Sequence, residues 1–231
     1  NGSFYYEYDE KDKEKTVVKT ENKPIENKAD ALKILQTANI AQGGAKLDNL
    51  KTLRVKGNGM GLEITILVDV ENQKICNELR MNGKLVGIEQ TEGNSGWQWM
   101  NNQKTPLAAK RLAEMNRTFS TGILGLRNNS LKSFAIQSAE LKSESNMKTV
   151  IVDIEGEKYG MIFDANDYLV GEITVSADGK ESTISKDFKK VDGIVFPFSS
   201  TTTSDTQTLV VNFTSVEVNP VFAEKTWEVP N

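Results

Sequence analysis

The chain has 231 residues, of which 38% are hydrophobic and 26% charged, with a formal net charge of −4, a balance typical of a globular protein. Acidic and basic residues are interspersed, which excludes the basic stripe of a nucleic-acid-binding protein, and no apolar run reaches the roughly 18 residues of a membrane-spanning helix. The sequence has no histidine and one cysteine, Cys76, which excludes an internal disulfide, an imidazole base and a histidine zinc ligand.

The first 28 residues differ in composition from the rest of the chain. An aromatic clump, YYEY, precedes the charged run DEKDKEK and the polar TVVKTENKPIEN. We interpret residues 1–28 as a solvated tail or linker, with a short edge strand over 16–20 as the alternative. Residues 29–231 then form one domain. The chain starts at Asn1 without a signal-peptide pattern, so we expect it to be trimmed from a precursor or a longer polypeptide.

A helix is predicted from about Lys28 to Gln42. Asn27 can cap its start, apolar residues recur every three or four positions, and Gly43-Gly44 can end it with a positive φ. From Lys51 the period changes to two, which indicates a half-buried strand. The residues that share its apolar face are Leu62, Ile64, Ile66, Val68 and Val70.

Two strands and a tight turn follow. Asn82-Gly83 is the pair that a two-residue hairpin turn requires, so residues 74–81 and 84–91 should pair. Residues 96–100, GWQWM, then indicate a strand with Trp97 and Trp99 on one side. We favour ordinary core for these two rings, with stacking on a sugar or lining a lipid cavity as the alternatives.

A second helix is predicted over about 106–115. Thr105 followed by Pro106 is typical of a helix start, and Ala108, Leu112 and Met115 lie on one apolar stripe. Beyond it, residues 120–132 are ambiguous. Ile123, Leu124 and Leu126 can form a further helical turn before a break at Asn128-Asn129.

From residue 134 the sequence alternates strand-like runs with Gly, Asn and Asp turn signals. Strands joined this closely are antiparallel neighbours. Asp164, Asn166 and Asp167 suggest a calcium loop, but a turn is favoured because the glycine and distal glutamate of such loops are missing. Residues 219–231 indicate a turn and an extended tail. The predicted strands are 134–142, 147–155, 158–164, 168–176, 181–189, 194–202 and 207–217.

The pattern predicts a mainly β (α+β) fold. About eleven strands in meander order form a sheet that accumulated twist must curl, giving a large curved antiparallel sheet or half-open β-barrel. Its apolar face must be covered, and two or three short helices are available to cover it. If the helices do not fill the hollow, an apolar cavity remains, which is the usual form of a small-molecule site.

Five segments stand in a characteristic order and spacing along the chain: AQGGAKLDNLKTL (41–53), GNSGWQWM (93–100), YGMIFDANDYLV (159–170), DFKKVDGIVFP (187–197) and VEVNPVF (216–222). In these segments and their order the chain resembles the LolA/LolB-like family of outer-membrane lipoprotein carriers and lipoprotein-sorting proteins, especially divergent members of the Bacteroidetes type. The chain is also similar to an extension found behind some pitrilysin-type zinc peptidases, although it lacks the His-x-x-Glu-His motif of the peptidase itself.

This resemblance implies a half-open antiparallel barrel with helices as a lid and an apolar interior that accepts acyl chains. It implies no catalysis and no cofactor. It also implies an exported protein, in the periplasm or associated with the outer membrane, whose partners are lipid or lipoprotein acyl chains and other envelope proteins. We expect a monomer.

We therefore expect a non-enzymatic binding protein that holds an apolar ligand between the sheet and its helices. The alternative is a structural or protein-interaction module with a filled core, such as an accessory domain of an exported peptidase. No catalytic residue and no metal ligand are expected, and Cys76 is expected to be a plain thiol because no imidazole can activate it. The residues predicted to line the cavity are Ile64, Ile66, Trp97, Trp99, Leu112, Met115, Phe163, Phe196 and Phe198.

Overall fold

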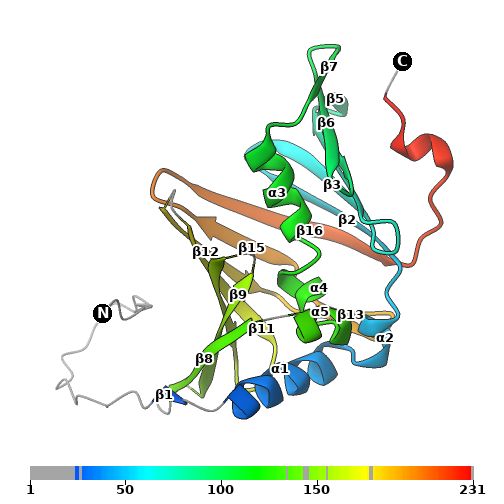
Figure 1. The fold of residues 1–231 in the computed structure, drawn as a ribbon. Helices are drawn as coiled ribbons and strands as arrows, with labels where there is room; N and C mark the ends of the chain where they lie inside the picture. Colours follow the sequence, from blue (N-terminus) through cyan, green and yellow to red (C-terminus); the bar gives the residue numbers. More distant parts are fainter. Residues whose placement is uncertain are drawn as a thin grey trace, which may run out of the picture.

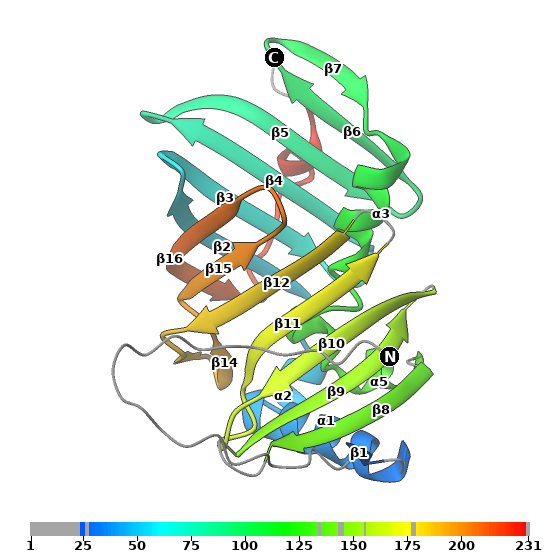
Figure 2. The same ribbon diagram turned by 90° about the vertical axis from the view of Figure 1, so that its left-hand side faces the viewer.

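The computed structural model describes residues 24–25, 28–133, 135–142, 146–154, 156–176 and 179–229. Within them the dominant feature is a 14-stranded antiparallel sheet with the order β1-β8-β9-β10-β11-β12-β15-β16-β2-β3-β4-β5-β6-β7. The sheet curves around the helices, and β1 and β7 are its two open edges (Figures 1 and 2). The prediction of a mainly β fold with a curved antiparallel sheet and short helices is confirmed. The predicted tail lies outside the described residues except at β1, Pro24–Ile25.

One half of the sheet is a meander of three hairpins. Their turns use residues in the left-handed region, and Asn82 (φ 52°) and Gly83 (φ 74°) form the turn that their sequence predicts. The other two turns contain Met60-Gly61 and Asn101-Asn102. The strands are β2 Thr52–Gly59, β3 Leu62–Asp69, β4 Lys74–Met81, β5 Lys84–Glu92, β6 Ser95–Met100 and β7 Gln103–Pro106.

The other half of the sheet is a second meander, whose last strand pairs with β2 and so joins the two halves. Asp164 holds the β10–β11 turn, because its Oδ1 accepts the backbone N–H groups of Asn166 and Tyr168, each at 2.9 Å. This confirms the predicted turn. The strands are β8 Ala135–Lys142, β9 Met147–Ile154, β10 Glu157–Phe163, β11 Leu169–Ser176, β12 Gly179–Lys186, β15 Ser199–Thr203 and β16 Thr208–Val218.

The segment between β12 and β15 leaves the main sheet. The predicted strand over 194–202 is wrong, because the chain forms a separate hairpin of β13, Lys189–Val191, and β14, Ile194–Phe196, before it rejoins the sheet. Pro197 supplies no N–H for a continuous ladder at this point. The backbone N–H of Phe198 then bonds the carbonyl of Lys186 at 3.0 Å and brings the chain back. Buried β14 lies against α1 (Lys28–Gln42), since Gln42 Nε2 donates to Val195 O at 3.4 Å.

The first predicted helix is confirmed as α1, but the predicted helix start at Thr105-Pro106 is wrong. The Asn101-Asn102 turn folds the chain back onto β6, so residues 103–106 form the edge strand β7, where a proline is tolerated. Helix α3 begins at Ala109, and Asn128 starts a further helix instead of ending one. The remaining helices are α2 Ala45–Asp48, α3 Ala109–Arg117, α4 Gly122–Gly125, α5 Asn128–Ser133 and the short 3-10 helix η1 Glu224–Trp227. No helix among the described residues is long and apolar enough to cross a membrane.

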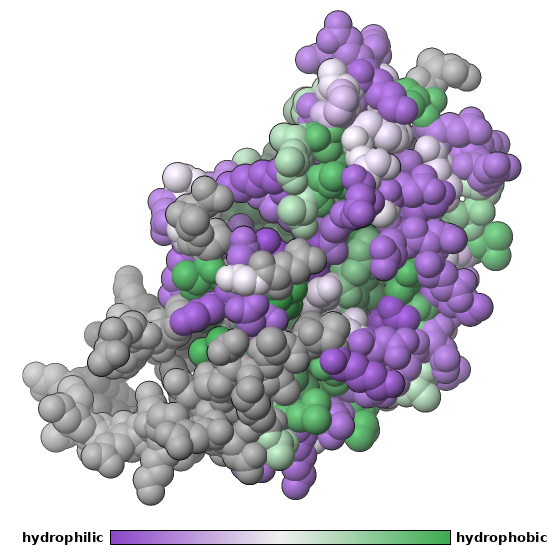
Figure 3. All heavy atoms as spheres, viewed as in Figure 1, coloured by the Kyte–Doolittle hydropathy of each residue, from purple (hydrophilic) through white to green (hydrophobic). Residues whose placement is uncertain are grey.

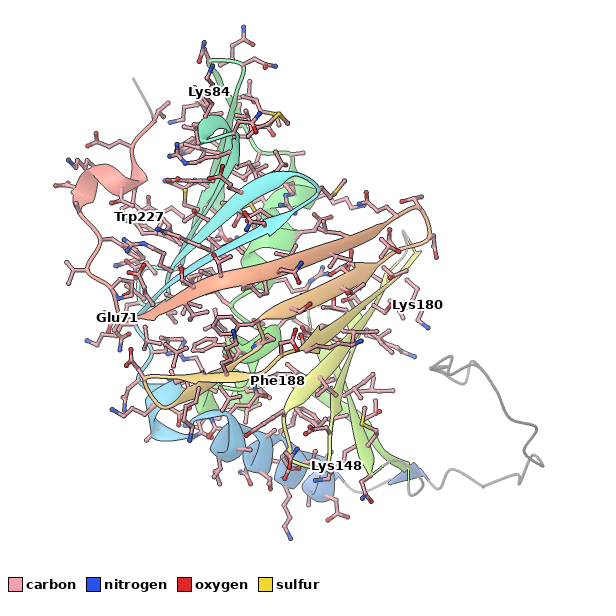
Figure 4. All side chains as sticks on the ribbon, turned by 180° about the vertical axis from the view of Figure 1, so that it is seen from behind. Glu71, Lys84, Lys148, Lys180, Phe188 and Trp227 are labelled. Atoms are coloured by element: carbon pink, nitrogen blue, oxygen red, sulfur yellow. The ribbon has the colours of Figure 1, made fainter. Side chains whose placement is uncertain are left out.

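The sheet buries apolar side chains on both faces. The main cluster lies on the concave face under the helices and includes Leu35, Val68, Phe163 and Phe196. A smaller cluster on the other face contains Leu67, Cys76 and Ile88 and is covered by the segment that carries Phe222 and Trp227 (Figure 4). The alternation predicted for residues 62–70 is confirmed, because Leu67 faces away from Ile66 and Val68, but the strand is not half-buried as expected at this point. Leu67 is buried because a segment distant in sequence covers the second face.

Candidate functional site

Helix α3 lies across the concave face of the sheet (Figure 1). Its approach depends on Gly96 of β6, where an added Cβ would lie 2.7 Å from Leu107 Cδ1 and 3.1 Å from Leu112 Cδ1. Met115 of α3 is buried in the main apolar cluster. The local sequence thus explains the seat of α3, since a glycine in the strand lets the two leucines contact the backbone of the sheet.

Two ion pairs tie α3 to the two halves of the sheet. Arg111 binds Glu89 of β5 through two bonds, Nε–Oε1 at 3.0 Å and Nη2–Oε2 at 2.6 Å, and Arg117 binds Glu157 of β10 at 2.5 Å. The hydrogen bond with Glu89 is the main reason why the pKa of Arg111 is raised. Because these pairs keep partial contact with water, each contributes only about 0.5–1 kcal/mol. The two ion pairs therefore orient α3 on the sheet but add little to the free energy that holds it there.

Cavities flank α3 on two sides. A cleft of about 470 Å³ separates the helix from β10, β11 and β12, and its volume lies in the range of small-molecule sites. A smaller cavity of about 260 Å³ is lined by Leu112, Asn116 and Ile154 among others, and Arg117 borders both cavities. Figure 3 shows that this side of the molecule is hollowed beside α3, with hydrophilic side chains around the opening.

The wall of the larger cleft is polar and charged. Glu172 of β11 lies in it, and its Oε1 accepts the backbone N–H of Gly122 at 2.7 Å; the same N–H lies 3.2 Å from the Tyr159 hydroxyl oxygen. Burial raises the pKa of Glu172 to about 7, although the bond from Gly122 opposes the shift. The other charged side chains of the cleft are Lys110, Arg111, Glu114, Arg117, Lys180, Glu181 and Asp205. An amphipathic molecule could place its polar end here.

Six of the nine residues predicted to line a cavity come together on the concave face, and a seventh lies on the same strand face. Ile64 shares the face of Ile66 on β3 by alternation and is partly exposed. Met115, Phe163 and Phe196 are buried in the main cluster, and Ile66, Leu112 and Phe198 pack against it.

Trp97 and Trp99 do not join this cluster, and the prediction that they face the helices is wrong. They pair with Gln90 and Ile88 of β5, so they lie on the face covered by Trp227, whose carbonyl accepts a bond from Gln90 Nε2 at 3.1 Å. The rings share one side, as predicted. The opposite face of β6, which carries Gly96, is the one that contacts α3. This glycine was the signal in the sequence for the face on which the helix packs.

Sequence reasoning did not identify the polar cleft. Glu172 opposes Met161 across β10 and β11, so a carboxylate stands among the inward-facing apolar residues of that wall. The signal was this single acid in the apolar run LVGEITV. Among the described residues, no cluster of acidic or cysteine side chains is arranged to hold a metal ion.

An open, curved antiparallel sheet with helices on its concave face defines the architecture. No protein-family model matches the sequence, and no match is found among curated proteins. Solved structures of low sequence identity do match. A LolA superfamily protein from Nitrosomonas europaea is 12% identical, with 86% of this chain and 97% of that chain covered and a TM-score of 0.55. A proposed outer membrane lipoprotein-sorting protein domain from Vibrio parahaemolyticus is 9% identical (87% and 97% covered, TM-score 0.57), and a DUF1329 family protein from Desulfovibrio piger is 6% identical (87% and 96% covered, TM-score 0.59). The chain has a LolA-like fold.

Proposed function

We propose that the protein is a non-enzymatic binding protein that holds the acyl chains of a lipid or lipoprotein between α3 and the concave face of the sheet. The observation that carries this proposal is the space on both sides of α3, about 470 and 260 Å³, directly beside the main apolar cluster. The LolA-like fold and the lipoprotein-sorting description of one structural neighbour support it.

Acyl chains would enter by displacing α3 from the sheet. The helix is held there by the contacts of Leu107 and Leu112 with Gly96, by Met115, and by the two partly exposed arginine pairs. A bound chain contributes about 0.8 kcal/mol per buried CH₂, and this burial offsets the loss of these contacts. The apolar wall for the chains is formed by Ile64, Ile66, Leu112, Met115, Phe163, Phe196 and Phe198.

The polar cleft beside α3 suits the head group of the same ligand. Arg117 borders both cavities, and Glu172 and Tyr159 add a carboxyl and a hydroxyl to the larger one. A ligand could therefore lie with its chains under the helix and its polar end in the cleft. The location that fits this role is the cell envelope, in the periplasm or at the outer membrane.

Native mass spectrometry tests the proposal directly. The protein is measured as purified and after extraction with organic solvent, and the extracted protein is titrated with a fluorescent fatty acid. We expect a lipid adduct that extraction removes, and saturable binding of the fatty acid.

A matched pair of variants locates the site. Leu112→Gln should weaken fatty-acid binding about tenfold, because it places an amide against the chains. Ile40→Gln changes a residue of α1 that is 73% exposed and should bind like the unmodified protein. Circular dichroism confirms that both variants fold. A folded protein that carries no lipid and binds no fatty acid would refute the proposal and favour an interaction module with a filled core.

A further inference from the structure

Of the hairpin turns at one end of the sheet, three carry an exposed methionine each. The β2–β3, β4–β5 and β6–β7 turns share this end because their strands form one antiparallel meander. Met60, Met81 and Met100 stand at these turns and are 73%, 50% and 50% exposed. We call residues 56–63, 78–86 and 98–105 the hairpin rim.

Exposed apolar side chains are concentrated on this rim. Large hydrophobic residues exposed in the described part of the chain also include Val86, which belongs to the rim, and Val210, whose backbone carbonyl lies against Gly59 beside it. Met60 has a φ of 53°, a left-handed conformation that costs a residue with a Cβ free energy and that asparagine or glycine adopts more readily. A bulky apolar residue at such a turn indicates a surface that contacts something apolar.

The charge of the rim is opposite in sign to that of the whole chain. It carries four basic side chains, Lys56, Arg80, Lys84 and Lys104, but only two carboxylates, whereas the net charge of the chain is −4. The carboxylates are already engaged: Glu63 accepts the N–H of Gly83 at 2.9 Å, and Glu78 pairs with Arg80 at 3.3 Å.

The rim therefore combines apolar tips with basic flanks. Lys84 stands at this end of the molecule, and α1 lies at the other (Figure 4). Proteins bind to the surface of an anionic bilayer by two combined effects. Apolar side chains insert at the boundary between the head groups and the acyl chains, and lysines are attracted to the negatively charged head groups.

We propose that the hairpin rim docks the protein onto the surface of a membrane that contains anionic lipids. The three methionines enter the boundary between head groups and acyl chains, and Lys84 and Lys104 lie among the head groups. This surface is separate from the space around α3, so docking does not require a ligand beneath the helix.

Vesicle flotation tests the docking. The probe is phosphatidylcholine vesicles with or without phosphatidylglycerol. We expect the protein to float with the anionic vesicles, less so at high salt, and to stay unbound with the neutral ones. A triple variant, Met60→Ser/Met81→Ser/Met100→Ser, and a charge variant, Lys84→Glu/Lys104→Glu, should each bind at least about tenfold more weakly.

Matched controls lie at the far end of the molecule. Ile40→Ser removes an apolar side chain as exposed as Met60, and Lys190→Glu reverses an exposed charge on β13; both should float like the unmodified protein. Leu112→Gln should also float normally even when fatty-acid binding is lost, which separates this inference from the proposed function. It is overturned if the unmodified protein does not bind anionic vesicles, if the rim variants bind as well as the controls, or if the methionines instead mediate self-association in solution.

Discussion

Replacing Trp227 by alanine should uncover the convex face of the sheet. Residues 219–229 form a C-terminal strap over that face. Asn219 Oδ1 accepts the backbone N–H of Lys51 at 2.8 Å, and the ring of Trp227 meets that of Phe222 edge to face at 5.4 Å. The strap covers Cys76, which is 1% exposed, together with Leu67 and Ile88.

The magnitude follows from what the Trp227 ring covers. Removing a fully buried tryptophan costs about 3–5 kcal/mol, but Trp227 keeps some exposure, so its share is about half of that. The edge-to-face pair with Phe222 adds about 0.5–1.5 kcal/mol. We expect Trp227→Ala to lower the free energy of unfolding by about 2–4 kcal/mol in urea titrations.

The thiol of Cys76 reports whether this loss is local. Burial, with Glu78 as a smaller cause, raises the pKa of Cys76 to about 12, so the thiol reacts with a disulfide reagent only when the strap opens. A local loss of about 2 kcal/mol should speed the reaction about thirtyfold. Val221→Ala is the matched control, since Val221 lies on the same strap and is 94% exposed. Unchanged stability and an unchanged thiol reaction in Trp227→Ala would refute the covering role.

Two further predictions concern α3 and the cleft. Gly96→Ala places a Cβ 2.9 Å from the carbonyl oxygen of Gln90 and against Leu107 and Leu112, so it should lower the free energy of unfolding by about 1–3 kcal/mol in urea titrations. Gly87→Ala is the control: the nearest atom to its added Cβ is 3.7 Å away, so the free energy of unfolding should change little. Burial raises the pKa of Glu172 from 4.5 to about 7, so the folded protein binds this proton more tightly than the unfolded chain does. The free energy of unfolding should therefore fall by about 1–3 kcal/mol as the pH rises from 4.5 to about 7, a range that allows for the partial exposure of Glu172. Glu172→Gln should make this pH dependence flatter in urea titrations. An equal cost for the two glycine variants, or an equal pH slope in Glu172→Gln, would contradict the respective prediction.

Local sequence signals predicted most of the elements. The apolar period of residues 28–42, the Asn82-Gly83 turn and the closely spaced strands each depend on neighbouring residues, and the structure has them close to where they were expected. The failure at Thr105-Pro106 has a different origin. A capping residue followed by proline suits both a helix start and the end of an edge strand, and the turn at Asn101-Asn102, which carries the chain back along β6, decides between them.

The faces of the sheet could not be predicted in the same way. Alternation along β6 places Trp97 and Trp99 together, but it does not say which face receives the helix. That choice depends on Leu107 and Leu112 reaching Gly96, and on the C-terminal strap reaching Ile88 from more than a hundred residues further along the chain. Both contacts are non-local, and the strap itself has the composition of an extended tail.

Amino-acid composition alone does not distinguish a filled core from a binding cavity. Residues such as Met115 and Phe163 are apolar in either case, because both a helix and an acyl chain exclude water from them. What differs is how the cover is held. On the convex face the strap combines apolar contacts with a ring pair and hydrogen bonds. Helix α3 is held by Leu112, Met115 and partly exposed ion pairs, and cavities lie on two sides of it. In the function that we propose, the concave face exchanges its cover for a ligand, while the strap on the convex face keeps the sheet folded.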